Sequence, residues 1–135
     1  MPDTEKKKIL VVEDDTALRR VLKEKLEDEH FEVLEAIDGI SGIEVATREH
    51  PHLILLDIFM PNMDGISMLS KLRGVDAWGK HVIVLVLTNS TDAETIARAT
   101  GLGATEFLIK SEWSLEALVG KIREHLSENA ANASE

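Results

Sequence analysis

Five side chains that can take part in phosphoryl transfer follow directly on apolar runs of the sequence. They are Glu13 and Asp14 after one run, Asp57 after a second, and Thr88 and Lys110 after two more. A carboxylate is an established nucleophile toward phosphoryl groups. A hydroxyl and an ammonium can stabilise the charge that spreads over the phosphoryl oxygens. The sequence therefore predicts a site at which Asp57 accepts a phosphoryl group.

The three carboxylates of this set predict a divalent cation. Adjacent strands of a sheet lie about 5 Å apart, so Glu13, Asp14 and Asp57 converge if the runs before them are neighbours. Carboxylates this close repel one another, and their pKa values rise unless a cation compensates the charge. Hard oxygen ligands with room left for water suit Mg²⁺, and Mn²⁺ is the next candidate.

Each of these residues alone has an ordinary structural role. A single Asp after a strand is usually a turn or capping residue, and a single Lys is usually solvated. The function is indicated by the combination, because four strand ends of one sheet carry the residue types that one chemistry needs. The next acid, Asp15, is predicted to cap the following helix rather than to bind the metal.

The apolar runs alternate with segments of helical period along the chain. Strands are expected over 7–12, 31–36, 53–57, 82–87 and 104–109. Helices are expected over 16–29, 39–49, 65–75, 93–99 and 115–126, with a loop at 76–81. This repetition predicts an α/β fold with a five-stranded, parallel, doubly wound sheet. The strand order 2-1-3-4-5 fits best, because 31–36 alternates between apolar and polar residues as a half-exposed edge strand does.

The composition is that of an acidic globular chain. The 135 residues predict one domain at 8–127, between an N-terminal tail at 1–7 and a polar C-terminal tail at 128–135. The sequence has no cysteine, which excludes disulfides and thiol chemistry. The formal net charge of −10 argues against sequence-independent nucleic-acid binding. No apolar segment approaches a membrane span or a signal-peptide core, so we expect a cytoplasmic protein that does not contact the membrane.

Four motifs resemble those of the receiver domain of two-component response regulators. They are VVEDD at 11–15, LLDIFMPNMDG at 55–65, LVLT at 85–88 and GATEFLIK at 103–110. The resemblance extends over residues 8–126 and implies a flavodoxin-like (βα)5 fold. The function implied is that of a stand-alone, chemotaxis-regulator-like receiver: a signalling switch with slow autodephosphorylation, not an enzyme for small molecules.

The resemblance implies a role for each matching residue of the site. Asp57 is the expected phosphoacceptor, and Lys110 is the expected phosphate-binding lysine. Glu13 and Asp14 are expected to hold Mg²⁺ together with Asp57 and the backbone carbonyl of Phe59. The phosphodonor would be a phosphohistidine on a sensor histidine kinase or a histidine phosphotransfer protein. Output to an unknown downstream protein would pass through the face made by the fourth helix, the fifth strand and the final helix.

The resemblance also implies a switch from Thr88 to an aromatic residue, Phe107, which turns inward when Thr88 moves. Phe107 has no hydroxyl, so no hydrogen bond from this position can lock the active state. Asn89 stands where receivers usually carry a small residue, and it narrows donor access or contacts the phosphate. Ser90 and Phe59 border the phosphate, and Phe59 is expected to shield the acyl phosphate from water.

One further departure from the family pattern is Ser111, which replaces the proline that usually follows the lysine after a cis bond. A cis bond before a residue other than proline costs about 2.5–4 kcal/mol, so we expect either a trans bond with a reshaped loop or a strained cis bond. A phosphorylation-independent, receiver-like interaction module therefore remains an alternative. A phosphatase or phosphotransferase for small molecules is disfavoured, because Phe59 stands where such enzymes place a second acid. Monomer and phosphorylation-dependent dimer both remain open.

Overall fold

Strands and helices alternate along the chain in the computed structural model, which describes residues 6–89 and 92–133, with side chains as far as residue 127. The elements are β1 (Lys8–Val12), α1 (Thr16–Asp28), β2 (Glu32–Ala36), α2 (Gly39–Glu49), β3 (Leu53–Leu56), α3 (Gly65–Val75), α4 (Ala77–His81), β4 (Ile83–Thr88), α5 (Ala93–Gly101), β5 (Glu106–Ile109), the 3-10 turn η1 (Lys110–Glu112) and α6 (Leu115–Ala133). Within the described ranges, no helix combines the length and the apolar character that crossing a membrane requires.

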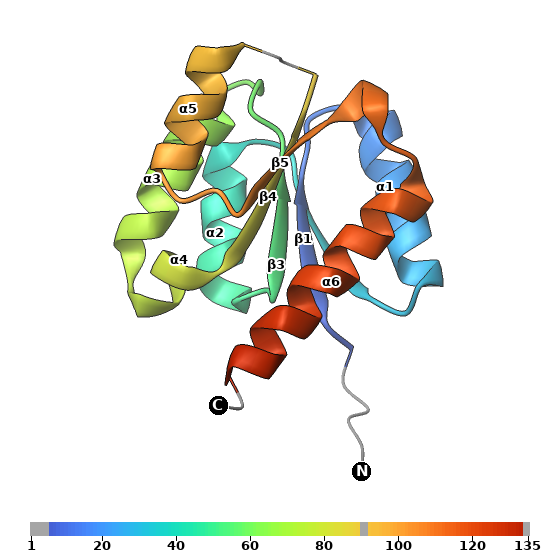
Figure 1. Cartoon of the computed structure of the whole chain (residues 1–135). Helices are drawn as coiled ribbons and strands as arrows, with labels where there is room; N and C mark the ends of the chain where they lie inside the picture. Colours follow the sequence, from blue (N-terminus) through green and yellow to red (C-terminus); the bar gives the residue numbers. More distant parts are fainter. Residues whose placement is uncertain (1–5, 90–91, 134–135) are drawn as a thin grey trace.

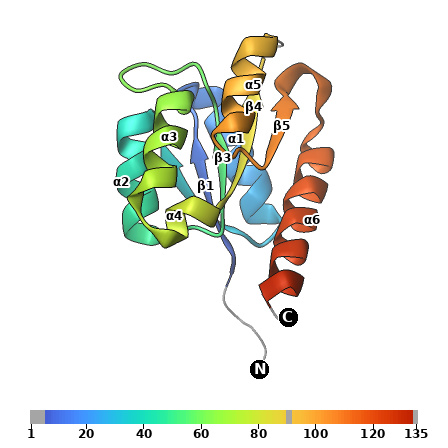
Figure 2. The same ribbon diagram turned by 60° about the vertical axis from the view of Figure 1, so that its left-hand side comes forward.

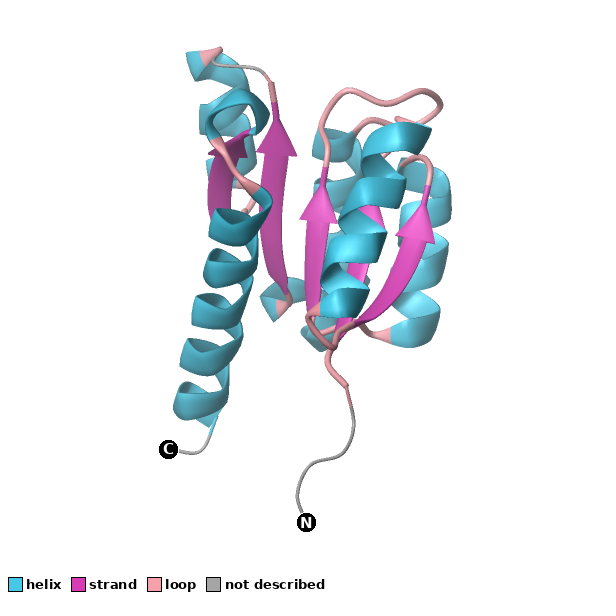
Figure 3. Ribbon diagram, turned by 90° about the vertical axis from the view of Figure 1, so that its right-hand side faces the viewer, coloured by secondary structure: helices cyan, strands magenta, loops and turns pink. Residues whose placement is uncertain are grey.

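The five strands form one parallel sheet in the order β2-β1-β3-β4-β5, as predicted. All strands point the same way, so their carboxyl ends meet along one edge (Figure 3). β2 is an edge strand with only its last residue buried, which confirms the half-exposed edge predicted from its alternation. The register pairs Val12 with Leu56, so the residues that follow these two strands emerge side by side.

Helices cover both faces of the sheet (Figure 1). α1 and α6 pack on one face, and α2, α3 and α5 pack on the other. Successive strand residues point to opposite faces, so Ile9 and Val11 join the core under α1 and α6, whereas Leu10 and Val12 join the other core. Burying each such side chain contributes about 1.5–3 kcal/mol, which explains why β1, β3 and β4 are almost wholly aliphatic.

The segment 76–81, predicted as a loop, contains the short helix α4 instead. Asp76 caps it, because its side chain accepts a hydrogen bond of 2.8 Å from the backbone N–H of Gly79. The guanidinium of Arg73 then donates to the carbonyl oxygens of Gly79 and Val82, at 2.9 and 2.8 Å. Trp78 of this helix is half-buried and stacks on His50, with ring centroids 4.2 Å apart.

Helix α6 is longer than predicted. The expected helix ended at Leu126 and a polar tail was expected from residue 128, but α6 continues to Ala133. Alanine and glutamate are both good helix formers, so this Ala-rich stretch extends the helix where its polarity alone had indicated a tail.

Candidate functional site

The three predicted carboxylates lie together at the carboxyl edge of the sheet. One oxygen from each of Glu13, Asp14 and Asp57 falls within 4.8 Å of the others. The register explains this arrangement, because Val12 and Leu56 are paired and the Asp57 N–H donates to the Val12 carbonyl at 3.0 Å. Glu13 and Asp57 are only 3% and 7% exposed, whereas Asp14 is exposed to solvent.

Glu13 is the most constrained member of this cluster. Its Oε1 accepts a hydrogen bond of 2.8 Å from the Lys110 ammonium, and its Oε2 accepts one of 3.1 Å from the backbone N–H of Asp15. Lys110 Nζ lies farther, at 3.6 Å, from Asp57 Oδ2. Without a phosphoryl group, the ammonium of Lys110 therefore lies between both acids and closer to Glu13.

The electrostatics of the cluster favour an added cation. Burial, and after it the charge of Glu13, raises the pKa of Asp57 to about 6 against the opposing effect of Lys110. Burial alone lowers the pKa of the Lys110 ammonium, but its hydrogen bond to Glu13 and the charge of Asp57 raise that pKa above its usual value. The ammonium of Lys110 thus lies within 3.6 Å of two of the three carboxylates, Glu13 and Asp57. This donor set fits a hard divalent cation, because the oxygens are close and Asp14 opens the site to water.

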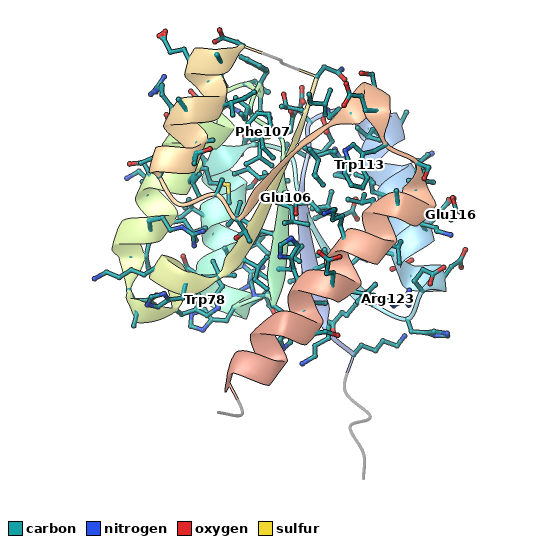
Figure 4. All side chains as sticks on the ribbon, in the orientation of Figure 1. Trp78, Glu106, Phe107, Trp113, Glu116 and Arg123 are labelled. Atoms are coloured by element: carbon teal, nitrogen blue, oxygen red, sulfur yellow. The ribbon has the colours of Figure 1, made fainter. Side chains whose placement is uncertain are left out.

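Thr88 and Lys110 reach the same edge from β4 and β5. Thr88 is the last residue of β4, is fully buried and pairs in register with Ile109, the residue before Lys110. Phe107 lies on β5, half-buried against the core under α2, α3 and α5 (Figure 4). Asn89 is exposed beyond β4, and Ser90 lies outside the described residues.

The loop from β3 to α3 carries Phe59, whose side chain is 61% exposed. Its far end is anchored by contacts that the sequence interpretation missed. The Asn62 amide donates to the Asp38 carboxylate at 2.7 Å, and the Gly39 N–H donates to the Met63 carbonyl at 2.8 Å. The Asp-Gly pairs of the sequence were the available signal, because Asp caps a helix and Gly permits close backbone approach.

Gly65 illustrates that approach most clearly. Its N–H donates to the Ile58 carbonyl at 2.8 Å. A Cβ atom at this position would collide with the carbonyl oxygen of Asp57, so α3 begins directly against the backbone of the candidate phosphoacceptor.

The chain after Lys110 differs from the usual family pattern. The Lys110–Ser111 peptide bond is trans, and the chain turns through the 3-10 segment η1, so the expected alternative of a reshaped loop is the one observed. Trp113 follows this turn and lines a small cavity of about 70 Å³ that also touches Lys110. The helix-cap role predicted for Asp15 is confirmed, since its carboxylate accepts from the Leu18 N–H at 3.2 Å.

Comparison with known families agrees with this geometry. The family model of the response regulator receiver domain matches residues 9–123. The chain belongs to this family. Receiver domains serve phosphorylation-dependent signalling in two-component systems, and the predicted resemblance is therefore confirmed.

Curated relatives of this receiver domain differ in length. Sporulation initiation phosphotransferase F of Bacillus subtilis is 31% identical over 76% of this chain and 81% of its own length. Response regulator PleD of Caulobacter vibrioides is 38% identical, again over 76% of this chain but only 22% of its own length. A probable transcriptional regulator, ycf27 of Porphyridium aerugineum, is 31% identical over 95% of this chain. The chain spans about half the length of this last relative and of a second ycf27 protein.

Solved receiver structures share the fold. A CheY-like receiver domain protein from Methanospirillum hungatei JF-1 superposes with a TM-score of 0.88 at 29% identity, covering 95% of this chain and 99% of that one. Chemotaxis protein CheY4 of Vibrio cholerae gives a TM-score of 0.82 at 28% identity, covering 89% and 98%. These likenesses confirm the predicted flavodoxin-like fold.

Proposed function

We propose that this chain is a Mg²⁺-dependent switch that accepts a phosphoryl group on Asp57 from a phosphohistidine of a histidine kinase or histidine phosphotransfer protein in the cytoplasm. The observation that carries the proposal is the buried carboxylate pair of Glu13 and Asp57, with Asp14 beside it and one ammonium within reach of both. A carboxylate cluster with too little positive charge is suited to receive a cation and then a phosphoryl group.

In the proposed reaction an oxygen of Asp57 attacks the phosphorus of the phosphohistidine. The new O–P bond forms as the P–N bond breaks, and the imidazole leaves with the electron pair of that bond. A divalent cation held by Glu13, Asp14, Asp57 and the backbone carbonyl of Phe59 would offset the repulsion between the attacking and transferring oxygens. The Lys110 ammonium shifts from Glu13 toward a phosphoryl oxygen, where it stabilises the negative charge of the transferring phosphoryl group.

The response then spreads from β4 to β5. The Thr88 hydroxyl moves toward the phosphoryl group, and Phe107 turns into the space that Thr88 leaves. The face of α5, β5 and α6 thereby changes its affinity for a downstream protein. Asn89 narrows donor access or contacts the phosphate, and Ser90 borders the phosphate and influences its hydrolysis. Phe59 folds over the acyl phosphate and excludes water.

The test is intact-protein mass spectrometry after incubation with acetyl phosphate, with Mg²⁺ or with EDTA. We expect a single phosphoryl adduct that requires Mg²⁺ and is lost in Asp57→Asn. Asp64→Asn is the matched control, because Asp64 is an exposed helix cap, and asparagine caps as well as aspartate does. If wild type shows neither an adduct nor a change in Trp fluorescence with beryllofluoride and Mg²⁺, the proposal is wrong.

A second candidate is a phosphorylation-independent interaction module with the receiver fold. One observation favours it, namely that Lys110 Nζ lies 2.8 Å from Glu13 but 3.6 Å from Asp57, so an internal ion pair already neutralises one of the acids in the resting site. The same beryllofluoride titration separates the two candidates, because only the switch responds to it.

A further inference from the structure

A groove lies between α3 and α5, on the face of the sheet opposite α6. The two helices run side by side in both ribbon views (Figure 1, Figure 2). The groove has a volume of about 590 Å³ and is lined by Ile66, Ser67, Ser70, Lys71, Arg98 and Leu102. Ile66 is buried and Leu102 is half-buried, so the floor is apolar, whereas Lys71 and Arg98 are exposed.

The charge of this groove opposes that of the whole chain. The net charge is −10, yet Glu94 is the sole acidic residue in the sequence of α3 and α5, and three cations accompany it. Arg73, one of the three, turns inward to donate to the carbonyls of Gly79 and Val82. The other two, Lys71 and Arg98, have no hydrogen-bond or ion-pair partner for their side chains in the part of the chain that the structure describes.

Some of the other surface cations are paired with carboxylates. Lys23, Lys25 and Arg123, for example, each lie within 3.3 Å of a carboxylate oxygen. Others, such as Arg20 and Lys80, also have no such partner among the described residues. Lys71 and Arg98 differ from these because both line one groove with an apolar floor, and this arrangement of charge is complementary to an anionic partner.

Gly101 keeps the groove open at its α5 side. It lines the groove within the last turn of the helix, and a Cβ atom built there would meet no atom within 4 Å. Its φ is not positive, so the backbone does not require glycine. A larger side chain at this position would fit the helix and project into the groove. A substitution of Gly101 can therefore be used to fill the groove.

We propose that the groove between α3 and α5 docks an acidic segment of a partner protein. An apolar side chain of that segment covers Ile66 and Leu102, and its carboxylates pair with Lys71 and Arg98. A protein segment fits better than an inorganic anion because the floor is apolar, and better than a small ligand because small ligands favour enclosed cavities. The groove shares α5 with the proposed output face but includes neither Asp57 nor β5 and α6, so it extends that surface toward α3.

The test uses a fluorescein-labelled amphipathic peptide of about 15 residues, long enough to form a helix, with Leu on one side and Glu on both flanks. Fluorescence anisotropy measures its affinity for the full chain, and amide NMR shifts locate it. We expect binding that weakens as salt rises from about 0.05 to 0.5 M, with amide shifts confined to α3 and α5. We expect Gly101→Leu and the double variant Lys71→Glu/Arg98→Glu each to weaken binding about tenfold or more.

Matched controls separate the groove from general effects. Gly120→Leu places the same side chain at another exposed helical glycine with open space, on α6, and Lys80→Glu reverses an exposed cation on α4. Both should bind as wild type does, and so should Asp57→Asn, which makes the result independent of the proposed phosphorylation. Thermal unfolding monitors the fold of each variant, and the charge-reversal pair alters only exposed side chains.

Several outcomes would overturn the proposal. Wild type could fail to bind the peptide, or a peptide with Gln in place of Glu could bind equally well, which would leave no role for the cations. If Gly101→Leu bound the peptide as tightly as wild type does, the peptide would bind outside this groove. Displacement of the peptide by millimolar inorganic phosphate would reassign the groove to a simple anion. Self-association of wild type that both groove variants abolish would reassign it to a second copy of this chain.

Discussion

Replacing Asp57 by asparagine should stabilise the metal-free protein. The carboxyl group has a pKa of about 6 in the folded chain and an ordinary value of 3.8. Each pKa unit corresponds to about 1.4 kcal/mol, so the ionised group costs the fold at most about 3 kcal/mol. Solvent at the edge of the site screens the charge and lowers this free-energy cost. We therefore expect the free energy of unfolding of Asp57→Asn to exceed that of wild type by about 1–3 kcal/mol at pH 7.5.

The sign of the pH dependence follows from linkage. Between about pH 4 and pH 6 the folded chain keeps a proton on Asp57 that the unfolded chain has lost, so the contribution of Asp57 to wild-type stability falls as pH rises through this window. Above about pH 6 the free-energy cost of the ionised Asp57 carboxylate is fully present, and below about pH 4 this cost disappears. The advantage of Asp57→Asn should therefore be largest at pH 7.5 and approach zero near pH 4.

Urea unfolding followed by circular dichroism measures both effects, at pH 7.5 and at pH 4.5 in EDTA. Millimolar Mg²⁺ should stabilise wild type and close the gap, because a cation that binds only the folded state shifts its equilibrium. Asp64→Asn, at an exposed helix cap, should change little at either pH. A variant less stable than wild type at pH 7.5 in EDTA, or a gain that does not vary with pH, would refute the electrostatic reasoning.

Three further predictions concern the same edge of the sheet. Lys110→Gln should cost about 1–3 kcal/mol in EDTA and slow adduct formation, because Glu13 loses its counter-charge; stability equal to wild type in urea unfolding would contradict this. Phe59→Ala should speed hydrolysis of the acyl phosphate, which is measured as the loss of the phosphoryl adduct over time in mass spectrometry. An unchanged hydrolysis rate would show that Phe59 does not shield the acyl phosphate. Gly65→Ala should cost about 1–3 kcal/mol through its collision with the backbone of the phosphoacceptor, whereas Gly74→Ala, in open space on the same helix, should gain up to about 1 kcal/mol; equal effects in thermal unfolding would count against the close approach.

The sequence was sufficient for the sheet and for the placement of the carboxylates, because both depend on short-range patterns. Aliphatic runs mark the buried strands, and a parallel sheet brings the residue after each run to one edge. The half-exposed pattern of 31–36 then fixed the strand order. Asp57 could be placed beside Glu13 without any knowledge of side-chain conformation.

What could not be predicted depends on contacts between distant segments. Whether Lys110 pairs with Glu13 or with Asp57 is decided by tenths of an ångström in side-chain position. Asn62 meets Asp38 only once two loops have been packed together. Helix α4 was missed for a different reason, since its cap at Asp76 is local, but its five residues are too few to show a helical period.

The two tryptophans of the chain lie at opposite ends of the molecule (Figure 4). Trp113 and Lys110 line the same cavity, so we expect the emission of Trp113 to change when that ammonium moves. Trp78 is stacked on His50, far from the carboxylates, and its emission depends on that ring instead. Trp113 can therefore serve as a fluorescence reporter of the site, with Trp78 as an internal reference. Trp113→Phe and Trp78→Phe would resolve the two signals and give a label-free readout of the site in real time.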